Sequence, residues 1–185
     1  MKSHRRMEHF LWPLARATLL PLVCGAAGLA WAGDEERKLE AVFLGRFANY
    51  IEWPANNRAT VVITLIDENP FGTLLDELYK NKKIQGKPID IKRVTKVEDI
   101  GTTDILFVTL DTVQSRQAAI DYAQKNAILS ISEAKGFAER GGLIQINFVE
   151  QRPLITINHE AAVKSKIKIG APLLSIARVV KEPAK

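Results

Sequence analysis

After residue 33 the chain alternates short, β-branched apolar segments with segments of helical period, and this alternation most constrains the fold. Thr60–Ile66 is almost wholly apolar, which predicts a strand covered on both faces. The apolar segments 104–110 and 128–132 are separated by a helical segment over 111–125. Since strands that alternate with helices form a parallel sheet covered by helices, the sequence predicts a doubly wound, mainly parallel α/β fold with helices on both faces.

The other elements follow from the same two periods. Leu39, Phe43 and Phe47 recur at a spacing of four, which predicts a helix over 34–52 that Trp53-Pro54 ends. Alternation across 144–158, broken at Glu150-Gln151, predicts a C-terminal antiparallel hairpin. We also expect a helix from Asn69, its N-cap, to Tyr79, a strand over 89–94, a helical turn over 97–100, and helices over 159–165 and 171–180.

The N-terminus has the layout of an export signal. Three basic residues lie within the first six positions, and an uncharged run of 16 residues follows from Ala17 to Ala32. The run ends in Ala30-Trp31-Ala32, which fits a small-x-small cleavage site. It is shorter than the roughly 20 residues needed to span a bilayer, and a retained N-terminal anchor is the alternative. We expect residues 1–32 to be a signal peptide, residues 33–185 to form one domain, and the mature chain to reside in the periplasm.

Removal of this leader changes the charge and the available chemistry. The whole chain carries a net charge of +5, but residues 33–185 carry only about +2. They show no basic stripe with interleaved aromatic residues, so nucleic-acid binding is not expected. The single cysteine, Cys24, lies in the leader, which leaves the mature chain without disulfides, thiol catalysis or thiolate metal sites.

No residue pattern indicates catalysis. His159 is the only histidine after the leader, so a histidine-based metal cluster or dyad would have to include it. It follows Asn158, a plausible helix N-cap, and we interpret it as a first-turn residue packed against the hairpin. Ser130 and Ser132 have no histidine nearby in the sequence to activate them. We therefore expect no enzymatic activity, no cofactor and no metal site.

Acidic and hydroxyl residues follow three predicted strands, at Asp67-Glu68, Asp111 and Ser132-Glu133. Open α/β sheets bind ligands at the carboxyl ends of their strands, so these groups are candidates for a divalent ion, a phosphoryl group or another small ligand. The final hairpin supplies no lysine that would complete a receiver-domain phosphorylation site. We interpret the acids as helix caps and solvated strand ends, with a small-ligand crevice near Asp67 and Ser132 as the alternative.

A glycine-bounded segment, Gly136–Gly142, predicts a surface loop on a rigid frame. Its three glycines can adopt positive φ, and they bracket Phe137, Glu139 and Arg140. Aromatic and arginine side chains dominate the energetics of many protein interfaces, which favours partner contact. The alternative is that Phe137 caps the edge of the core while Glu139 and Arg140 pair with neighbouring groups.

The mature chain resembles the YfiR family of periplasmic regulators from end to end. The glycine-bounded loop and the Trp-Pro helix end are distinctive as a pair. The matching motifs are Phe43-x-x-x-Phe47-x-x-x-Ile51-Glu52-Trp53-Pro54, Asn69-Pro70-Phe71-Gly72, Ile105-Leu106-Phe107-Val108, Gly136-Phe137-Ala138-Glu139-Arg140-Gly141-Gly142, Ile157-Asn158-His159-Glu160-Ala161-Ala162 and Leu173-Leu174-x-x-Ala177-Arg178-Val179-Val180.

The resemblance implies a doubly wound α/β domain that dimerises. It implies repression of a membrane diguanylate cyclase, or a similar sensor, by binding its periplasmic region, which lowers cyclic di-GMP and biofilm formation. Release through an outer-membrane lipoprotein is also implied. Some relatives carry disulfides that permit redox control, and the mature chain has no cysteine for this.

The leading hypothesis is thus a regulator that acts by protein–protein contact. Candidate contact residues are Phe71, Phe137, Glu139, Arg140 and a basic face of Lys164, Lys168 and Arg178. The basic residues could instead be a solvated face or favourable charge near a helix end. Other hypotheses are a periplasmic small-ligand binding protein that serves an envelope transporter, and a structural subunit of an envelope complex.

Overall fold

The computed structural model describes residues 27–55, 58–150 and 152–181, with side chains from residue 33 onward. The predicted signal peptide lies outside the described residues except for 27–32, whose backbone is helical. Its cleavage and the export of the chain therefore stay predictions.

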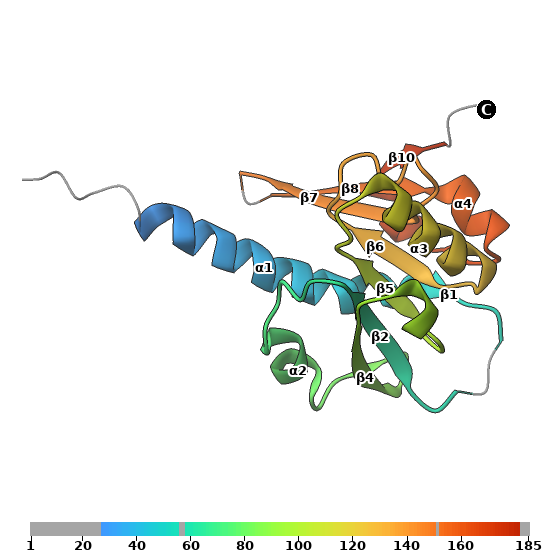
Figure 1. The fold of residues 1–185 in the computed structure, drawn as a ribbon, viewed down its shortest axis with the longest axis horizontal. Helices are drawn as coiled ribbons and strands as arrows, with labels where there is room; N and C mark the ends of the chain where they lie inside the picture. The colour runs from blue at the N-terminus through green and yellow to red at the C-terminus, as the bar shows by residue number, and fades with distance from the viewer. Residues whose placement is uncertain (1–26, 56–57, 151, 182–185) are drawn as a thin grey trace, which may run out of the picture.

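A curled sheet of eight strands organises the fold (Figure 1), with the order β10-β8-β7-β6-β5-β2-β4-β3. The adjacent strands β4, β2, β5, β6 and β7 pair in parallel in that order. Strands β7 and β8 form the predicted antiparallel hairpin. The strands are β2 (Val61–Ile66), β3 (Lys83–Ile84), β4 (Lys87–Val94), β5 (Ile105–Val108), β6 (Leu129–Ser132), β7 (Ile144–Val149), β8 (Arg152–Asn158) and β10 (Arg178–Val180).

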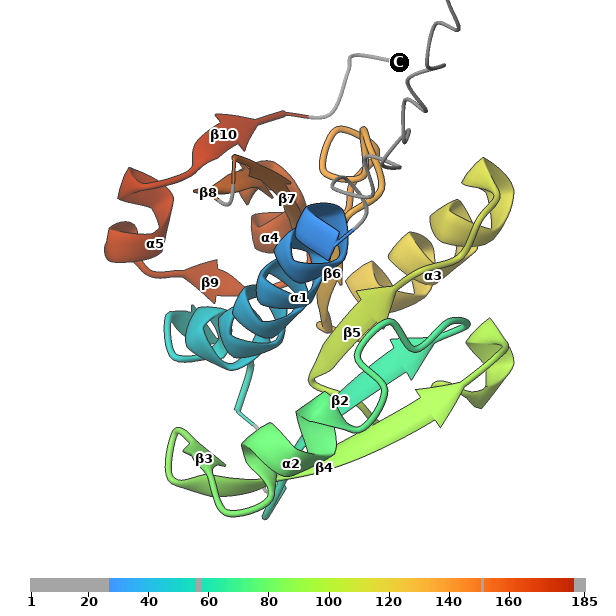
Figure 2. The same ribbon diagram turned by 90° about the vertical axis from the view of Figure 1, so that its left-hand side faces the viewer.

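Helices cover both faces of this sheet, as the alternation predicts. Figure 2 shows α1 (Ala27–Ala48) inside the curve of the sheet and α3 (Val113–Lys125) outside it. The shorter helices are α2 (Leu74–Tyr79), the 3₁₀ helix η1 (Val97–Asp99), α4 (His159–Lys164) and α5 (Ala171–Ser175). The doubly wound, mainly parallel α/β class with a C-terminal hairpin is confirmed.

The two faces bury separate apolar clusters because successive strand residues point to opposite sides. Ile105 and Phe107 of β5 join the cluster around α1, whereas Leu106 and Val108 join the cluster beneath α3. Phe47, on the inner face of α1, is 1% exposed within the first cluster. This double burial explains why the central strands are apolar at nearly every position.

The end of the first helix differs from the prediction. The helix stops at Ala48, and Ile51–Glu52 forms a short strand, β1, antiparallel to β9 (Lys168–Ile169). Gln85 Nε2, from the β3–β4 turn, donates to the carbonyl oxygens of Ala48 at 2.8 Å and Ile51 at 2.7 Å. These long-range hydrogen bonds satisfy carbonyls that further helix would have satisfied, so the helix ends before the Trp-Pro pair.

The start of the second helix and the end of the last one also differ. Asn69 accepts from the amide of Phe71 and donates to the carbonyl of Gly72, which closes a turn, so α2 begins only at Leu74. The helix expected over 171–180 stops at Ser175, and Arg178–Val180 forms β10, parallel to β8. A β-branched pair beside an open sheet edge favours a strand over continued helix.

Candidate functional site

The glycine-bounded loop between β6 and β7 is held firmly in place. The amide of Phe137 donates to Gln145 Oε1 at 3.0 Å, and Asn158 Nδ2 donates to the carbonyl of Ala138 at 2.8 Å. Gln124 Nε2, from α3, donates to the carbonyl of Gly141 at 2.9 Å. Side chains of β7, β8 and α3 therefore fix the loop backbone from three directions.

The glycines of this loop serve two different purposes. Gly136 and Gly141 have φ of 77° and 99°, in the region that disfavours a side chain. Gly142 does not have positive φ, and the prediction for it is wrong. A Cβ there would lie 2.2 Å from Cε1 of Phe137, so Gly142 is needed for close packing.

The two aromatic candidates are core residues. Phe137 is 1% exposed in the cluster beneath α3, and Phe71 is 5% exposed with its ring centroid 5.1 Å from that of Phe107. Burial removes both rings from the set of candidate contacts in this conformation. For Phe137 the alternative interpretation, a core residue, describes its environment.

Glu139 and Arg178 meet although 39 positions separate them in the chain. Glu139 Oε1 lies 2.7 Å from Arg178 Nη2, which ties the loop to the edge strand β10. Glu139 Oε2 is buried without a hydrogen-bond partner among the described residues. The Arg140 side chain is exposed. We call Glu139, Arg140 and Arg178 the loop–edge surface.

The other two basic candidates each lie beside an acid. Lys164 Nζ is 3.3 Å from Glu160 Oε1, and Lys168 Nζ is 3.3 Å from Glu52 Oε2. Together with the pair formed by Arg178, these contacts balance the charge of the predicted basic face. Attraction of an acidic partner to a bare basic patch therefore has little support from this geometry.

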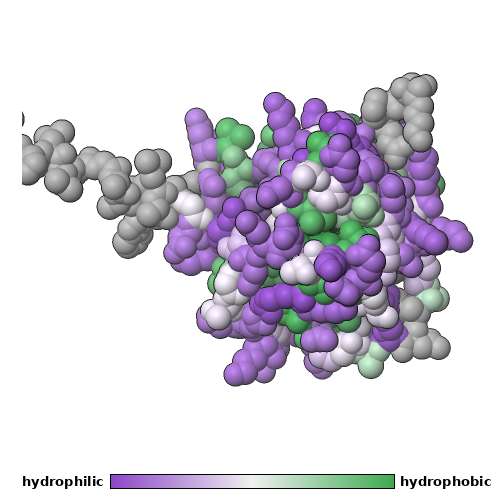
Figure 3. Space-filling view, viewed as in Figure 1, coloured by the Kyte–Doolittle hydropathy of each residue, from purple (hydrophilic) through white to green (hydrophobic). Residues whose placement is uncertain are grey.

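Exposed apolar side chains lie near the C-terminal end of the described chain. Ile176 is 68% exposed and Val179 is 51% exposed. The sequence predicted a helix over 171–180, so the exposure of these two side chains beside the edge strand was not expected. Figure 3 shows a face dominated by hydrophilic side chains, with apolar residues at the surface mainly near its centre.

A cavity of about 300 Å³ lies where sequence analysis places a strand-end crevice. Glu68, Asp111, Ser132 and Glu133 from the strand ends line it, together with Arg37 of α1. Asp67 is exposed and is not among the lining residues. The Ser132 hydroxyl donates to the carbonyl of Val108 at 2.6 Å and accepts from the amide of Ala134, so it is engaged in structure rather than in a nucleophilic arrangement.

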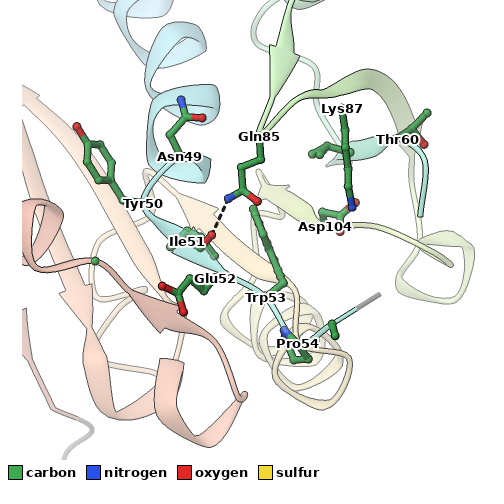
Figure 4. Close-up of a pocket in the computed structure, with 13 residues that line it drawn as sticks. Asn49, Tyr50, Ile51, Glu52, Trp53, Pro54, Thr60, Gln85, Lys87 and Asp104 are labelled. Carbon is green, nitrogen blue, oxygen red and sulfur yellow. Dashed lines mark hydrogen bonds between the residues drawn. The ribbon is translucent and has the colours of Figure 1, made fainter. Parts of the chain in front are cut away.

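A larger cavity, of about 630 Å³, lies at the Trp-Pro segment (Figure 4). Trp53, Gln85, Lys87 and Asp104 line it, and Trp53 Nε1 is buried without a partner among the described residues. Sequence reasoning treated Trp53-Pro54 only as a helix end and missed this cavity. An unpaired indole donor is the kind of signal that only the assembled structure supplies.

Neither a metal site nor a membrane-spanning helix is found within the part of the chain that the structure describes. No group of three or more His, Cys, Asp or Glu side chains there could hold a metal ion. No described helix is long and apolar enough to cross a membrane. His159 is exposed at the first turn of α4, where Asn158 caps the helix by accepting from the amide of Ala161.

The fold and these surfaces define a doubly wound α/β domain with open cavities and a firmly held loop that contacts the edge strand β10 of its sheet. The chain belongs to the YfiR/HmsC-like family, whose family profile matches residues 37–178. Other members of this family are periplasmic regulators linked to diguanylate-cyclase signalling.

Solved structures show the same fold at low identity. An ABC domain from Streptococcus pneumonia in complex with L-Trp superposes with a TM-score of 0.53 at 14% identity, over 76% of this chain. A conserved domain protein from Vibrio cholerae O1 biovar El Tor superposes with a TM-score of 0.51 at 14% identity, over 78% of this chain. The chain spans 60% of the length of each. No curated protein matches the sequence.

Proposed function

We propose that the chain is a periplasmic regulatory protein that represses a membrane-bound diguanylate cyclase, or a similar sensor, by binding its periplasmic region. The observation that carries this proposal is the match of the YfiR/HmsC-like family across residues 37–178. Repression lowers cyclic di-GMP and, with it, biofilm formation. The protein acts by contact and performs no chemistry of its own.

Repression by binding requires unequal affinity for two states of the partner. A ligand that binds the active and inactive states equally shifts nothing, so the chain must prefer the inactive state. A rigid surface suits this task, because little conformational entropy is lost when it binds. The loop–edge surface is rigid in this sense, since side chains of α3, β7 and β8 hold its backbone.

Arg140 is the residue of this surface that best fits a partner contact. It is exposed, while the loop backbone around it is fixed. Glu139 and Arg178 already pair with each other at 2.7 Å, so they orient the loop against β10 and present a polar rim. Lys164 and Lys168 remain part of the proposed contact set, although each has an acidic neighbour.

We also propose that the chain forms a homodimer. An outer-membrane lipoprotein would release the membrane partner from it.

The test is binding to the purified periplasmic region of a membrane-bound diguanylate cyclase from the same organism. Arg140→Ala should weaken that binding by about 2 kcal/mol if Arg140 is a central anchor. Lys80→Ala is the matched control, because Lys80 is an exposed cation at the C-cap of the distant helix α2. In cells, deletion of the chain should raise cyclic di-GMP, and Arg140→Ala should mimic the deletion in part. Unchanged affinity for Arg140→Ala together with lower thermal stability would assign Arg140 to the scaffold.

The strand-end cavity favours a second candidate function, a small-ligand binding protein that serves an envelope transporter. Its volume of about 300 Å³ lies at the low end of ordinary ligand pockets. Thermal-shift screening of the purified protein against periplasmic metabolites separates the two functions. A saturable ligand whose effect disappears in Ser132→Ala, with no membrane partner recovered by crosslinking, would favour the second.

A further inference from the structure

Two carboxyl groups share one guanidinium where α1 meets the sheet. Arg37 Nη1 lies 2.7 Å from Glu40 Oε2 and 2.7 Å from Glu133 Oε2, so the two carboxyl oxygens are at most twice that distance apart. Arg37 and Glu40 belong to α1, whereas Glu133 follows β6, 96 positions from Arg37. The contact joins the helix inside the sheet to the carboxyl edge of the sheet, beside the strand-end cavity.

The charges of this cluster do not balance when both acids are ionised. Glu40 is 0% exposed, and its Oε1 atom is buried without a partner among the described residues. A buried carboxylate with an unsatisfied oxygen is strongly disfavoured. Burial, reinforced by the negative charge of Glu133, raises the pKa of Glu40 to about 8 in spite of Arg37. Glu40 therefore holds a proton at neutral pH.

Two charged side chains, Arg37 and Glu133, act on the ionisation of Glu40. Arg37 stabilises its ionised form, and Glu133 opposes it. No ion pair joins Glu40 to the other charged residues around the adjoining cavity, within the described part of the chain. These residues are Glu68 after β2, Asp111 before α3 and Arg116 on α3.

A chain of hydrogen bonds leads from the cluster to the glycine-bounded loop. Asn147 Nδ2 donates to the carbonyl of Glu133 at 2.8 Å. Gln145 Nε2 donates to Asn147 Oδ1 at 2.6 Å, and Gln145 Oε1 accepts from the amide of Phe137 at 3.0 Å. The residue that contacts Arg37 is thus connected to the backbone beneath the loop–edge surface.

We propose that Arg37, Glu40 and Glu133 form a proton-dependent latch that holds α1 against the carboxyl edge of the sheet. With the proton on Glu40, the cluster is neutral and Arg37 bridges the helix to Glu133. When the proton leaves to solvent at alkaline pH, two anions compete for one cation and Glu40 becomes a buried charge. The latch then weakens, α1 loosens near Glu40, and the restraint on Glu133 is relaxed.

This device goes beyond the proposed function, since it does not depend on the identity of a partner. It makes the docking of α1 responsive to the pH around the protein. The hydrogen-bond chain from Glu133 to Phe137 gives that response a physical route to the loop–edge surface.

Infrared spectroscopy of the purified protein tests the latch directly, because a protonated carboxylic acid has its own carbonyl band. At about pH 6, a pH at which free glutamate is ionised, the wild-type protein should show this band, and the band should disappear as the pH rises through about 8. Glu40→Gln should lack the band throughout. Absence of the band in the wild type, or its persistence in Glu40→Gln, would overturn the proposal.

Two further variants keep the test informative if Glu40→Gln folds poorly. Glu133→Gln removes the neighbouring negative charge, so the band should titrate with a lower midpoint. Glu68→Gln is the matched control, since Glu68 lines the same cavity without contacting the latch, and it should leave the midpoint unchanged. If the infrared band titrated with the same midpoint in Glu133→Gln and in the wild type, the proposal that Glu40 and Glu133 share Arg37 would be refuted.

Hydrogen exchange reports whether the helix responds. After correction for the intrinsic pH dependence of exchange, the amides of residues 37–48 should lose protection over the same pH range as the infrared band. Those of β4, which lies away from the latch, should not. Uniform protection of residues 37–48 through the titration of Glu40 would refute a latch.

Discussion

Replacement of Glu40 by glutamine should flatten the dependence of the free energy of unfolding on pH. Folding raises the pKa of this carboxyl from its ordinary value of 4.5 to about 8, chiefly because the side chain is buried. Between these values the folded state holds a proton that the unfolded state has released. The free energy of unfolding therefore gains a contribution that is complete below 4.5 and is lost as the pH rises through about 8.

The magnitude follows from one proton. A difference of one bound proton between the folded and unfolded states changes the free energy of unfolding by about 1.4 kcal/mol per pH unit. Between about pH 5.5 and 7.5 the wild-type protein should thus lose about 3 kcal/mol that Glu40→Gln does not lose. The amide cannot ionise, and it keeps the shape of the protonated acid.

Urea denaturation at several pH values measures this difference, with the free energy extrapolated to water at each pH. Glu36→Gln, on the same helix and partly exposed, is the control and should run parallel to the wild type. A constant offset between wild type and Glu40→Gln over this pH range would refute the reasoning, because it would show that Glu40 ionises equally in both states.

Three other substitutions test the packing and surface arguments by the same denaturation assay. Gly142→Ala should destabilise the protein by about 2 kcal/mol or more, since the new Cβ would meet the buried Phe137 ring, and Phe137→Leu in the same chain should restore part of the loss. Tyr79→Phe should cost about 1–3 kcal/mol, because the buried hydroxyl donates to the carbonyl of Ala41 and accepts from the amide of Gly45; a neutral effect would contradict this. Lys168→Ala should change stability by less than about 1 kcal/mol, as expected of an exposed ion pair.

The positions of the central strands could be predicted from the sequence because their signal is local. A strand buried on both faces is apolar at nearly every position, and 60–66, 104–110 and 128–132 each contain the strand that was expected there. The alternation across 144–158 likewise predicted the hairpin. The glycine-bounded loop was located correctly because glycine marks positive φ, as found at Gly136 and Gly141.

The ends of the first and last helices depended on distant residues. Gln85 satisfies the carbonyls of Ala48 and Ile51, and the free edge of β8 pairs with Val179 and its neighbours. Helical periodicity continues past both ends, so the local pattern predicts longer helices. Only the competing contact, supplied from elsewhere in the chain, stops each one.

For this protein, the sequence by itself determined the α/β class, the order of the central strands and the family. These depend on periods of two and of 3.6 residues and on motifs that lie within short segments. The tertiary structure alone decided that Phe71 and Phe137 are buried, that Glu139 meets Arg178, and that Glu40 shares Arg37 with Glu133. Exposure and charge pairing are properties of groups brought together by folding, and residues 39 or 96 positions apart carry no local sign of their contact.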